Sequence, residues 1–146
     1  MKKIKAREIT DEKEQKKRLK MIGWAAQKAR LQALEMLYAK GTGNWGGAAS
    51  SAEVMNYLYF QQMNIDPLMP RAEWRDRFIL SKGHASAMLY ATMANRGYFD
   101  TEKLMSFRDI DSDLQGHPSM KMTPGVDMST GALGHGISVG LGMALA

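Results

Sequence analysis

The chain has 146 residues and a mass of 16.3 kDa, which is the length of a single domain. With 45% hydrophobic and 24% charged residues it has the composition of an ordinary globular protein, which excludes a disordered or fibrous chain. No apolar stretch reaches the ~20 residues of a membrane span. The absence of cysteine excludes disulfides and thiolate metal sites, and it fits a reducing, cytoplasmic compartment.

The net charge of +5 is concentrated at the N-terminus. Residues 1–20 hold nine Lys and Arg against four Asp and Glu, whereas the rest of the chain is balanced. A nucleic-acid-binding protein would usually carry basic residues and aromatics over its folded surface, and this distribution lacks them. We therefore interpret residues 1–14 as a solvated basic tail and expect one domain over residues 15–146, with neither nucleic acid nor membrane as a partner.

Apolar residues of the first third recur with helical spacing. They fall three or four positions apart between Leu19 and Leu37, and acidic residues crowd the positions before them. Lys40 and Gly41 then supply the basic residue and the glycine that commonly end a helix. This pattern predicts a single long helix over residues 11–40.

A glycine-rich segment separates this helix from a second one. Four of the seven residues from Gly41 to Gly47 are glycine, which predicts a loop. Ser50 and Glu53 have the spacing of a capping box, in which each side chain bonds a free backbone N–H. We therefore expect a second helix from this point to about Phe60.

A short apolar run at residues 77–80 is followed by Ser81, Lys82 and Gly83. We interpret the run as a buried strand that ends in a glycine turn. A helix is expected directly after it, from about residue 84 to residue 95, and Gly97 is expected to terminate this helix.

The last third combines a short helix, a long loop and a helix of small residues. Asp100 can cap a helix through Phe107, and the Gly-, Pro-, Asp- and Ser-rich residues 109–130 predict a loop of a length that is typical of functional segments. Residues 134–146 predict a helix able to pack closely on a flat surface. This helix reaches the last residue without a cap or breaker, so we expect the chain to be a fragment of a larger domain.

Three segments place glycines beside a histidine: residues 81–85, 114–118 and 129–135. Glycine lets backbone amides approach a ligand, a helix start favours negative charge, and histidine is a donor that can be neutral or cationic near pH 7. Together these features suit a phosphorylated ligand and a step that moves protons. Each segment alone is more typical of an ordinary turn than of a functional site, and the histidines lack the short spacing of a zinc site.

Taken in this order, the segments resemble the N-terminal part of transketolase, and most closely the N-terminal subunit of transketolases whose two halves are separate chains. The resemblance covers roughly residues 15–146. Related deoxyxylulose phosphate synthases share the glycine-rich loop but lack the Ser-Lys-Gly-His-Ala run, so they match less well. The matching positions are residues 77–85, Phe107 and Arg108, and residues 115–118, 123–136 and 142–144.

The resemblance implies an α/β fold, here the N-terminal portion of a thiamine diphosphate-binding domain in which helices flank a parallel sheet. It also implies a thiamine diphosphate enzyme of carbohydrate metabolism that transfers a two-carbon ketol unit from a ketose phosphate to an aldose. Its partner would be a C-terminal transketolase subunit that supplies the pyrimidine-binding domain. The paired halves would associate with a second pair, and sugar phosphates would be the substrates.

Family site residues fall on five positions of this chain. His84 matches the residue that contacts the cofactor diphosphate, and Gly131, Ala132 and Leu133 match residues that line the cofactor rings. His117 matches a residue beside the reacting carbons of the sugar. An imidazole there can assist proton transfer, which makes His117 the expected catalytic and substrate-binding residue.

Two departures from the family pattern bear on substrate and metal. The family's glycine loop commonly has a histidine that faces the substrate. Asn44 stands there in this chain and can bind a hydroxyl but cannot shuttle a proton at neutral pH. The Gly-Asp-Gly segment and the asparagine that bind Mg²⁺ have no match before Ala146, so the resemblance implies metal ligands beyond it. We expect this chain to be inactive alone; the alternative is a non-catalytic, truncated or degenerate module with an assembly or regulatory role.

Overall fold

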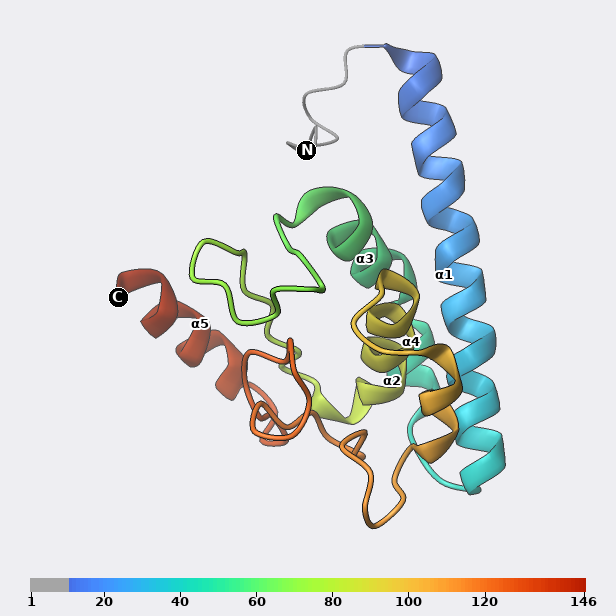
Figure 1. Ribbon diagram of the computed structural model, residues 1–146, viewed down its shortest axis with the longest axis vertical. Helices are drawn as coiled ribbons and strands as arrows, with labels where there is room; N and C mark the ends of the chain where they lie inside the picture. The colour runs from blue at the N-terminus through green and yellow to red at the C-terminus, as the bar shows by residue number, and fades with distance from the viewer. Residues whose placement is uncertain (1–10) are drawn as a thin grey trace.

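The structure, a computed structural model, describes residues 11–146. Within this range it has five α-helices, several shorter helical turns and no β-strand. Helix α1 (Glu12–Lys40) runs along one side of the molecule, and the shorter elements lie against its C-terminal half (Figure 1). The tail expected over residues 1–14 lies mostly outside the described residues, and residues 12–14 form the first turn of α1.

The expected helix over residues 11–40 is confirmed, together with its ends. Asp11 caps α1 by accepting a hydrogen bond from the backbone N–H of Lys13 at 2.9 Å. Gly41 ends the helix in the left-handed conformation, with φ of 61°. The face that carries Ala26, Ala29, Ala33 and Met36 is fully buried, and its small side chains let α1 pack closely on the rest of the domain.

The prediction for the glycine-rich segment and the capping box is wrong in detail. Part of the segment is helix α2 (Trp45–Ala49), and Ser51, not Ser50, occupies the N-cap of helix α3 (Ala52–Tyr57), without a side-chain cap bond. Glu53 does not reach back to the cap because Arg30 of α1 binds its carboxylate at 2.5 Å. A π-helical turn (Leu58–Gln62) extends α3, so this part of the chain is helical to about the expected end.

The helix predicted after the apolar run is confirmed. A 3₁₀ turn (Gly83–Ala85) leads into helix α4 (Ser86–Arg96), which Gly97 ends with φ of 97°. Nine consecutive residues of α4 are buried, because α4 is the central element that packs on α1, α2 and α3. A buried hydrogen bond of 3.2 Å from Asn56 of α3 to Thr92 of α4 fixes how these two helices face each other.

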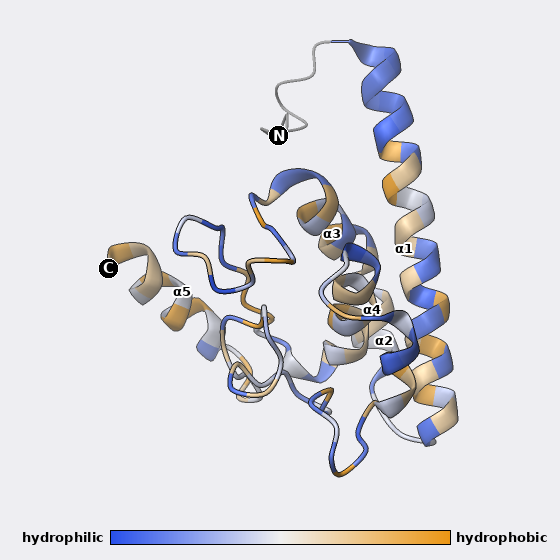
Figure 2. Ribbon diagram, in the orientation of Figure 1, coloured by the Kyte–Doolittle hydropathy of each residue, from blue (hydrophilic) through white to orange (hydrophobic). Residues whose placement is uncertain are grey.

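The elements after α4 match the prediction, except that one helix is shorter than expected. Residues Thr101–Ser106 form a 3₁₀ helix, and Asp100 precedes it without a side-chain cap bond. No helix forms in residues 109–130, as expected for a loop. Helix α5 (His135–Leu145) follows and lies apart from α1–α4, with most of its hydrophobic residues exposed (Figures 1 and 2).

The predicted strand at residues 77–80 is wrong, and the parallel sheet is absent from residues 11–146. The run is extended, but it has no strand partner in that range. Its neighbour is a second extended segment, residues 126–130, and the contact uses a side chain. The backbone N–H of Phe78 donates to the Asp127 carboxylate at 2.8 Å, whereas a sheet would need a backbone carbonyl there. The predicted sheet is therefore not supported, and the predicted fold is supported only by the structural comparisons reported below.

Candidate functional site

Glycine-bearing segments from different parts of the chain meet at the start of α4. The imidazole of His84 lies against α2, where a methyl group at Gly47 would come within 2.9 Å of its Nε2 atom. At Gly83, a methyl group would come within 2.7–2.9 Å of Thr130. Real Cβ atoms do not approach other atoms this closely, so glycine at both positions is what allows the segments to touch.

The segment around His117 is held in place from behind by α4. The hydroxyl of Tyr90 donates to the carbonyl of Gln115 at 2.9 Å, and the hydroxyl of Ser86 donates to the carbonyl of Gly116 at 2.8 Å. Burial raises the pKa of Tyr90, so its hydroxyl remains a donor at any physiological pH. These two bonds fix the backbone and leave the imidazole of His117 exposed to solvent.

The segment with Gly131, Ala132 and Leu133 lies beside His117. The backbone N–H of Thr130 donates to the carbonyl of Pro118 at 3.3 Å, and a methyl group at Gly131 would lie 3.7 Å from Cδ2 of His117. All three residues are exposed, and Leu133 presents 70% of its surface to solvent. An exposed leucine side chain beside the backbone of glycine and alanine can pack on the flat ring of a ligand.

Thr130 also carries an unused polar group. Its Oγ1 atom is buried against Gly83 and has no hydrogen-bond partner in residues 11–146. Buried hydroxyls normally have a partner, so this atom marks a place where a ligand or a water completes the surface. It lies between the turn that bears His84 and the segment that begins at Gly131.

A buried ion pair fixes the two extended segments that lead to these loops. Arg75 binds the carboxylate of Asp127 with both terminal nitrogens, one of them at 3.0 Å, and the two side chains are 4% and 3% exposed. Arg77 adds a weaker contact of 3.4 Å to the same carboxylate. This pair could not be predicted from the sequence, because no local pattern relates charges that are 52 residues apart.

Two further polar side chains, Asn44 and His135, belong to the glycine-bearing segments. Asn44 is exposed at the N-cap position of α2, and its side chain makes no cap bond. His135 is exposed at the start of α5, and its neighbour Gly136 lies against Ser81, where a methyl group would come within 2.5 Å. The third glycine–histidine segment therefore also meets the turn that bears His84.

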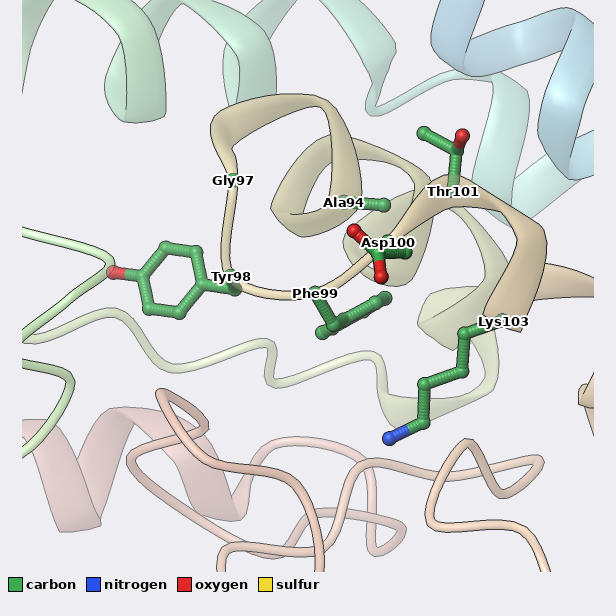
Figure 3. A pocket seen from close by; sticks show the side chains of 7 residues that line it. All are labelled: Ala94, Gly97, Tyr98, Phe99, Asp100, Thr101 and Lys103. Carbon is green, nitrogen blue, oxygen red and sulfur yellow. The ribbon is translucent and has the colours of Figure 1, made fainter.

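Neither a metal cluster nor a membrane-spanning helix is found in residues 11–146. No three His, Cys, Asp or Glu side chains there are grouped closely enough to hold a metal ion. In the same range, every helix is too short or too polar to cross a membrane. A hollow of about 670 Å³ lies beyond the end of α4 and is lined by Tyr98, Phe99, Asp100 and Lys103 among others (Figure 3). None of the predicted site residues lines it.

Fold and surface together define a class of protein: a helical domain in which glycine-bearing segments from different parts of the chain meet at the start of α4. Comparison with known proteins identifies the family. Residues 21–146 match the model of the transketolase thiamine diphosphate binding domain. The chain belongs to this family, and the resemblance seen in the sequence is confirmed.

Curated relatives include both split and single-chain transketolases. The chain is 40% identical over 121 residues to one subunit of the apulose-4-phosphate transketolase of Phocaeicola vulgatus, covering 83% of this chain and 43% of that protein. It is 45% identical over 117 residues to the 6-deoxy-6-sulfo-D-fructose transketolase subunit SqwG of a Clostridium species, covering 80% and 42%. The chain thus spans less than half the length of these relatives.

Solved transketolase structures share the fold. The Pichia stipitis transketolase, solved in complex with sedoheptulose 7-phosphate, superposes with a TM-score of 0.80 at 36% identity, over 85% of this chain and 18% of that one. The Leishmania mexicana transketolase gives a TM-score of 0.81 at 33% identity over 85% of this chain and 19% of that one. The described residues therefore have the fold of the corresponding part of a transketolase.

Proposed function

We propose that this chain is part of the thiamine diphosphate-binding half of a transketolase. The complete enzyme would transfer a two-carbon ketol unit from a ketose phosphate to an aldose. The observation that carries this proposal is the meeting of three glycine–histidine segments around Gly83 and Thr130, on a surface with an unpartnered hydroxyl and an exposed leucine.

The residues present fit thiamine diphosphate. His84 can donate a hydrogen bond to the anionic diphosphate, and the Nζ atom of Lys82, 3.1 Å from the hydroxyl of Ser50, adds a cation on the same turn. Gly131 and Ala132 let a ring approach the backbone, and Leu133 offers an apolar side chain to its face. The bound cofactor would supply an electron sink for cleavage and formation of carbon–carbon bonds.

His117 is proposed to hold and move the proton at the sugar. Its ring edge at Cδ2 faces Gly131, so the adjacent Nε2 atom lies toward the same surface. An imidazole can give or take a proton during a reaction, which suits a side chain beside the reacting carbons. Asn44, across the turn, would bind a sugar hydroxyl with its amide without exchanging a proton.

In this proposal, the metal ligands and the pyrimidine-binding domain are supplied by residues that are not in this chain. Mg²⁺ would be bound by residues beyond Ala146, because a hard cation needs several oxygen ligands. A C-terminal subunit would supply the pyrimidine-binding domain, and the paired halves would form a larger assembly. Two relatives that are named as transketolase subunits, each with a sugar in its name, support a divided enzyme with anionic sugar substrates. A cytoplasmic location is part of the same proposal.

The test uses the full-length subunit together with its partner. Titration calorimetry with thiamine diphosphate and Mg²⁺ should give saturable binding, and the loaded complex should transfer a ketol unit from xylulose 5-phosphate to an aldose. This chain alone should show no transfer. Absence of binding heat from the complete assembly under saturating conditions would contradict the proposal. It would favour the alternative, a non-catalytic module.

A further inference from the structure

The outer face of α1 carries a row of exposed apolar side chains. Trp24, Leu31 and Tyr38 are 70%, 58% and 88% exposed, and they follow one another at intervals of seven residues. Leu34 is also exposed and lies one turn after Leu31. At 3.6 residues per turn the four side chains fall within an arc of about 80°. They therefore form one strip along the helix, which we call the α1 stripe.

The α1 stripe lies on the side of the helix opposite the domain core. The buried residues of α1, among them Ala29 and Ala33, face α3 and α4. Helix α1 forms one edge of the molecule, so its stripe faces away from the glycine–histidine segments at the start of α4 (Figure 1). A contiguous exposed row that includes a tryptophan and a tyrosine is typical of a surface that binds another protein.

The interval of seven residues indicates that this other surface is a helix. Two helices that lie side by side contact each other through apolar positions that recur every 3.5 residues on average. The α1 stripe has this repeat, with intervals of seven, three and four residues. It extends from residue 24 to residue 38, which is about four turns of contact along one face.

Two charges beside the α1 stripe favour a second copy of the same chain as the partner. Lys28 and Glu35 are exposed and lie along the same side of the stripe, each four residues after a stripe residue. Neither has an ion-pair partner in the described part of the chain. When two copies meet in antiparallel orientation about a two-fold axis at Leu31, these sides of the stripes face each other. Lys28 then lies opposite the partner's Glu35, and the symmetry forms this pair twice.

The same register matches the other positions along the helix. Leu31 faces the partner's Leu31, and Trp24 faces the partner's Tyr38, so that large side chains meet at each level. Lys20 comes to lie just beyond the C-terminal end of the partner's α1, where a positive charge is favourable. Apolar and charged positions are thus complementary in one arrangement.

A parallel pair lacks this complementarity. Its symmetry brings opposite sides of the two stripes together, so Lys28 would no longer meet Glu35. The cation available to Glu35 would be Arg30, which Glu53 of its own chain already binds at 2.5 Å. The charges therefore select the antiparallel orientation.

We propose that the α1 stripe pairs with the α1 stripe of a second copy of this chain in antiparallel orientation. One helix face is small beside the roughly 800 Å² per partner of a standard stable interface, so the pair is weak and reversible. It is separate from the association of paired halves in the proposed function, because it lies away from the glycine–histidine segments. In a complete enzyme this contact would join one assembly to another.

Cysteine cross-linking tests the pair, because the chain has no cysteine of its own. All variants carry Leu141→Lys, which interrupts the exposed apolar surface of α5, and a short bismaleimide joins the introduced thiols. Leu31→Cys should cross-link to itself. Trp24→Cys and Tyr38→Cys should each fail alone, because identical residues lie about 20 Å apart at 1.5 Å per residue. A mixture of these two variants should cross-link.

An exchange of charges tests the register. Added to Leu31→Cys, Lys28→Glu should lower the cross-linked fraction by about threefold or more, because two attractive pairs become repulsive. The further change Glu35→Lys restores opposite charges and should recover the cross-link. Leu68→Cys is the control for random collision, because Leu68 is 88% exposed in a turn outside α1.

Three results would overturn the inference. The first is a yield for Leu31→Cys no higher than that for Leu68→Cys. The second is self-cross-linking of Trp24→Cys, or a yield that Lys28→Glu leaves unchanged, since either contradicts the antiparallel register. The third is loss of the Leu31→Cys cross-link in the full-length subunit with its partner, which would show that other parts of the enzyme cover α1. None of these measurements requires cofactor binding or transfer, so the proposed function is tested separately.

Discussion

His84 and His117 have different surroundings, and their expected roles differ accordingly. The ring of His84 is half-buried against Gly47, whereas the ring of His117 is exposed beside Gly131. A ring that is seated on backbone has few orientations and suits a fixed binding contact. An exposed ring is accessible to a substrate, which suits a group that gives or takes a proton. Substitutions should therefore separate cofactor binding from turnover.

His84→Ala should weaken cofactor binding in the complete enzyme. Loss of one hydrogen bond to a charged group should raise the dissociation constant of thiamine diphosphate by about tenfold or more. The value of kcat at saturating cofactor should change much less. Calorimetry and steady-state kinetics measure the two quantities. A fall in kcat with unchanged cofactor affinity would show that His84 has been given the wrong role.

Gly47→Ala tests the contact from the opposite side. A methyl group there would lie 2.9 Å from Nε2 of His84, so it should displace the imidazole and raise the cofactor dissociation constant, though by less than His84→Ala. Gly46→Ala is the matched control, because Gly46 is in the same helix and has no atom within 4 Å of the added carbon. Equal affinities for these two variants would exclude the contact.

His117→Ala should slow turnover while it leaves cofactor affinity within about twofold. General acid–base groups contribute about 10²–10⁴ in rate, so we expect kcat to fall by at least about 100-fold. His117→Gln can still form a hydrogen bond but cannot titrate, and it should be almost as slow. If cofactor affinity collapses in either variant, His117 belongs to the diphosphate site.

Among the elements, the extended segments before the site depend on one buried ion pair. Asp127→Ala would leave Arg75 buried without its partner, and such a loss typically costs about 3–5 kcal/mol of unfolding free energy. Asp127→Asn should cost less, because its oxygen can still accept from the backbone of Phe78. The exposed pair of Lys103 and Asp113 is the control, and Lys103→Ala should cost no more than about 1 kcal/mol. Denaturant unfolding measures the free energy of unfolding of each variant. Similar decreases of this free energy for Asp127→Ala and Lys103→Ala would contradict this ranking.

Local signals predicted the helix ends that depend only on nearby residues. Gly41 and Gly97 end α1 and α4 with positive φ, as their positions after a helical pattern indicated. The capping box failed because its decisive interaction is not local. Arg30, 23 residues earlier, takes the carboxylate of Glu53, and the sequence between them gives no sign of that contact.

The predicted strand failed for a similar reason. Residues 77–80 have the apolar character of a buried strand, and they are extended. Whether an extended run becomes a strand depends on the backbone groups that approach it from elsewhere in the chain. Here the carboxylate of Asp127, 49 residues after Phe78, takes the backbone N–H that a strand partner would use.

At the scale of the whole molecule, the sequence could indicate candidate site residues but not their geometry. The glycine–histidine pattern and the family resemblance predict roles for His84, His117 and the segment from Gly131 to Leu133, and these roles remain predictions. Neither could indicate that Gly83 touches Thr130, or that Arg108 lies on Gly116. Those contacts depend on how α4 packs against α1 and orients the turns at its ends.

Helix α5 leaves apolar surface uncovered. Ile137, Leu141 and Leu145 are 78%, 62% and 79% exposed, and their four-residue spacing places them in one stripe. Figure 2 shows the largely hydrophobic character of this helix. A contiguous apolar stripe is more costly in water than scattered leucines, and it drives association of folded chains.

The 146-residue chain alone should therefore associate with itself as its concentration rises. Leu141→Lys interrupts the stripe at its centre and should shift the chain to monomer, which sedimentation velocity across a concentration series would measure. Leu68→Lys is the control, because Leu68 is 88% exposed in a turn far from α5 in sequence. If Leu68→Lys reduces association as much as Leu141→Lys, general charge repulsion is the cause. If the wild-type chain stays monomeric throughout, the α5 stripe does not drive association.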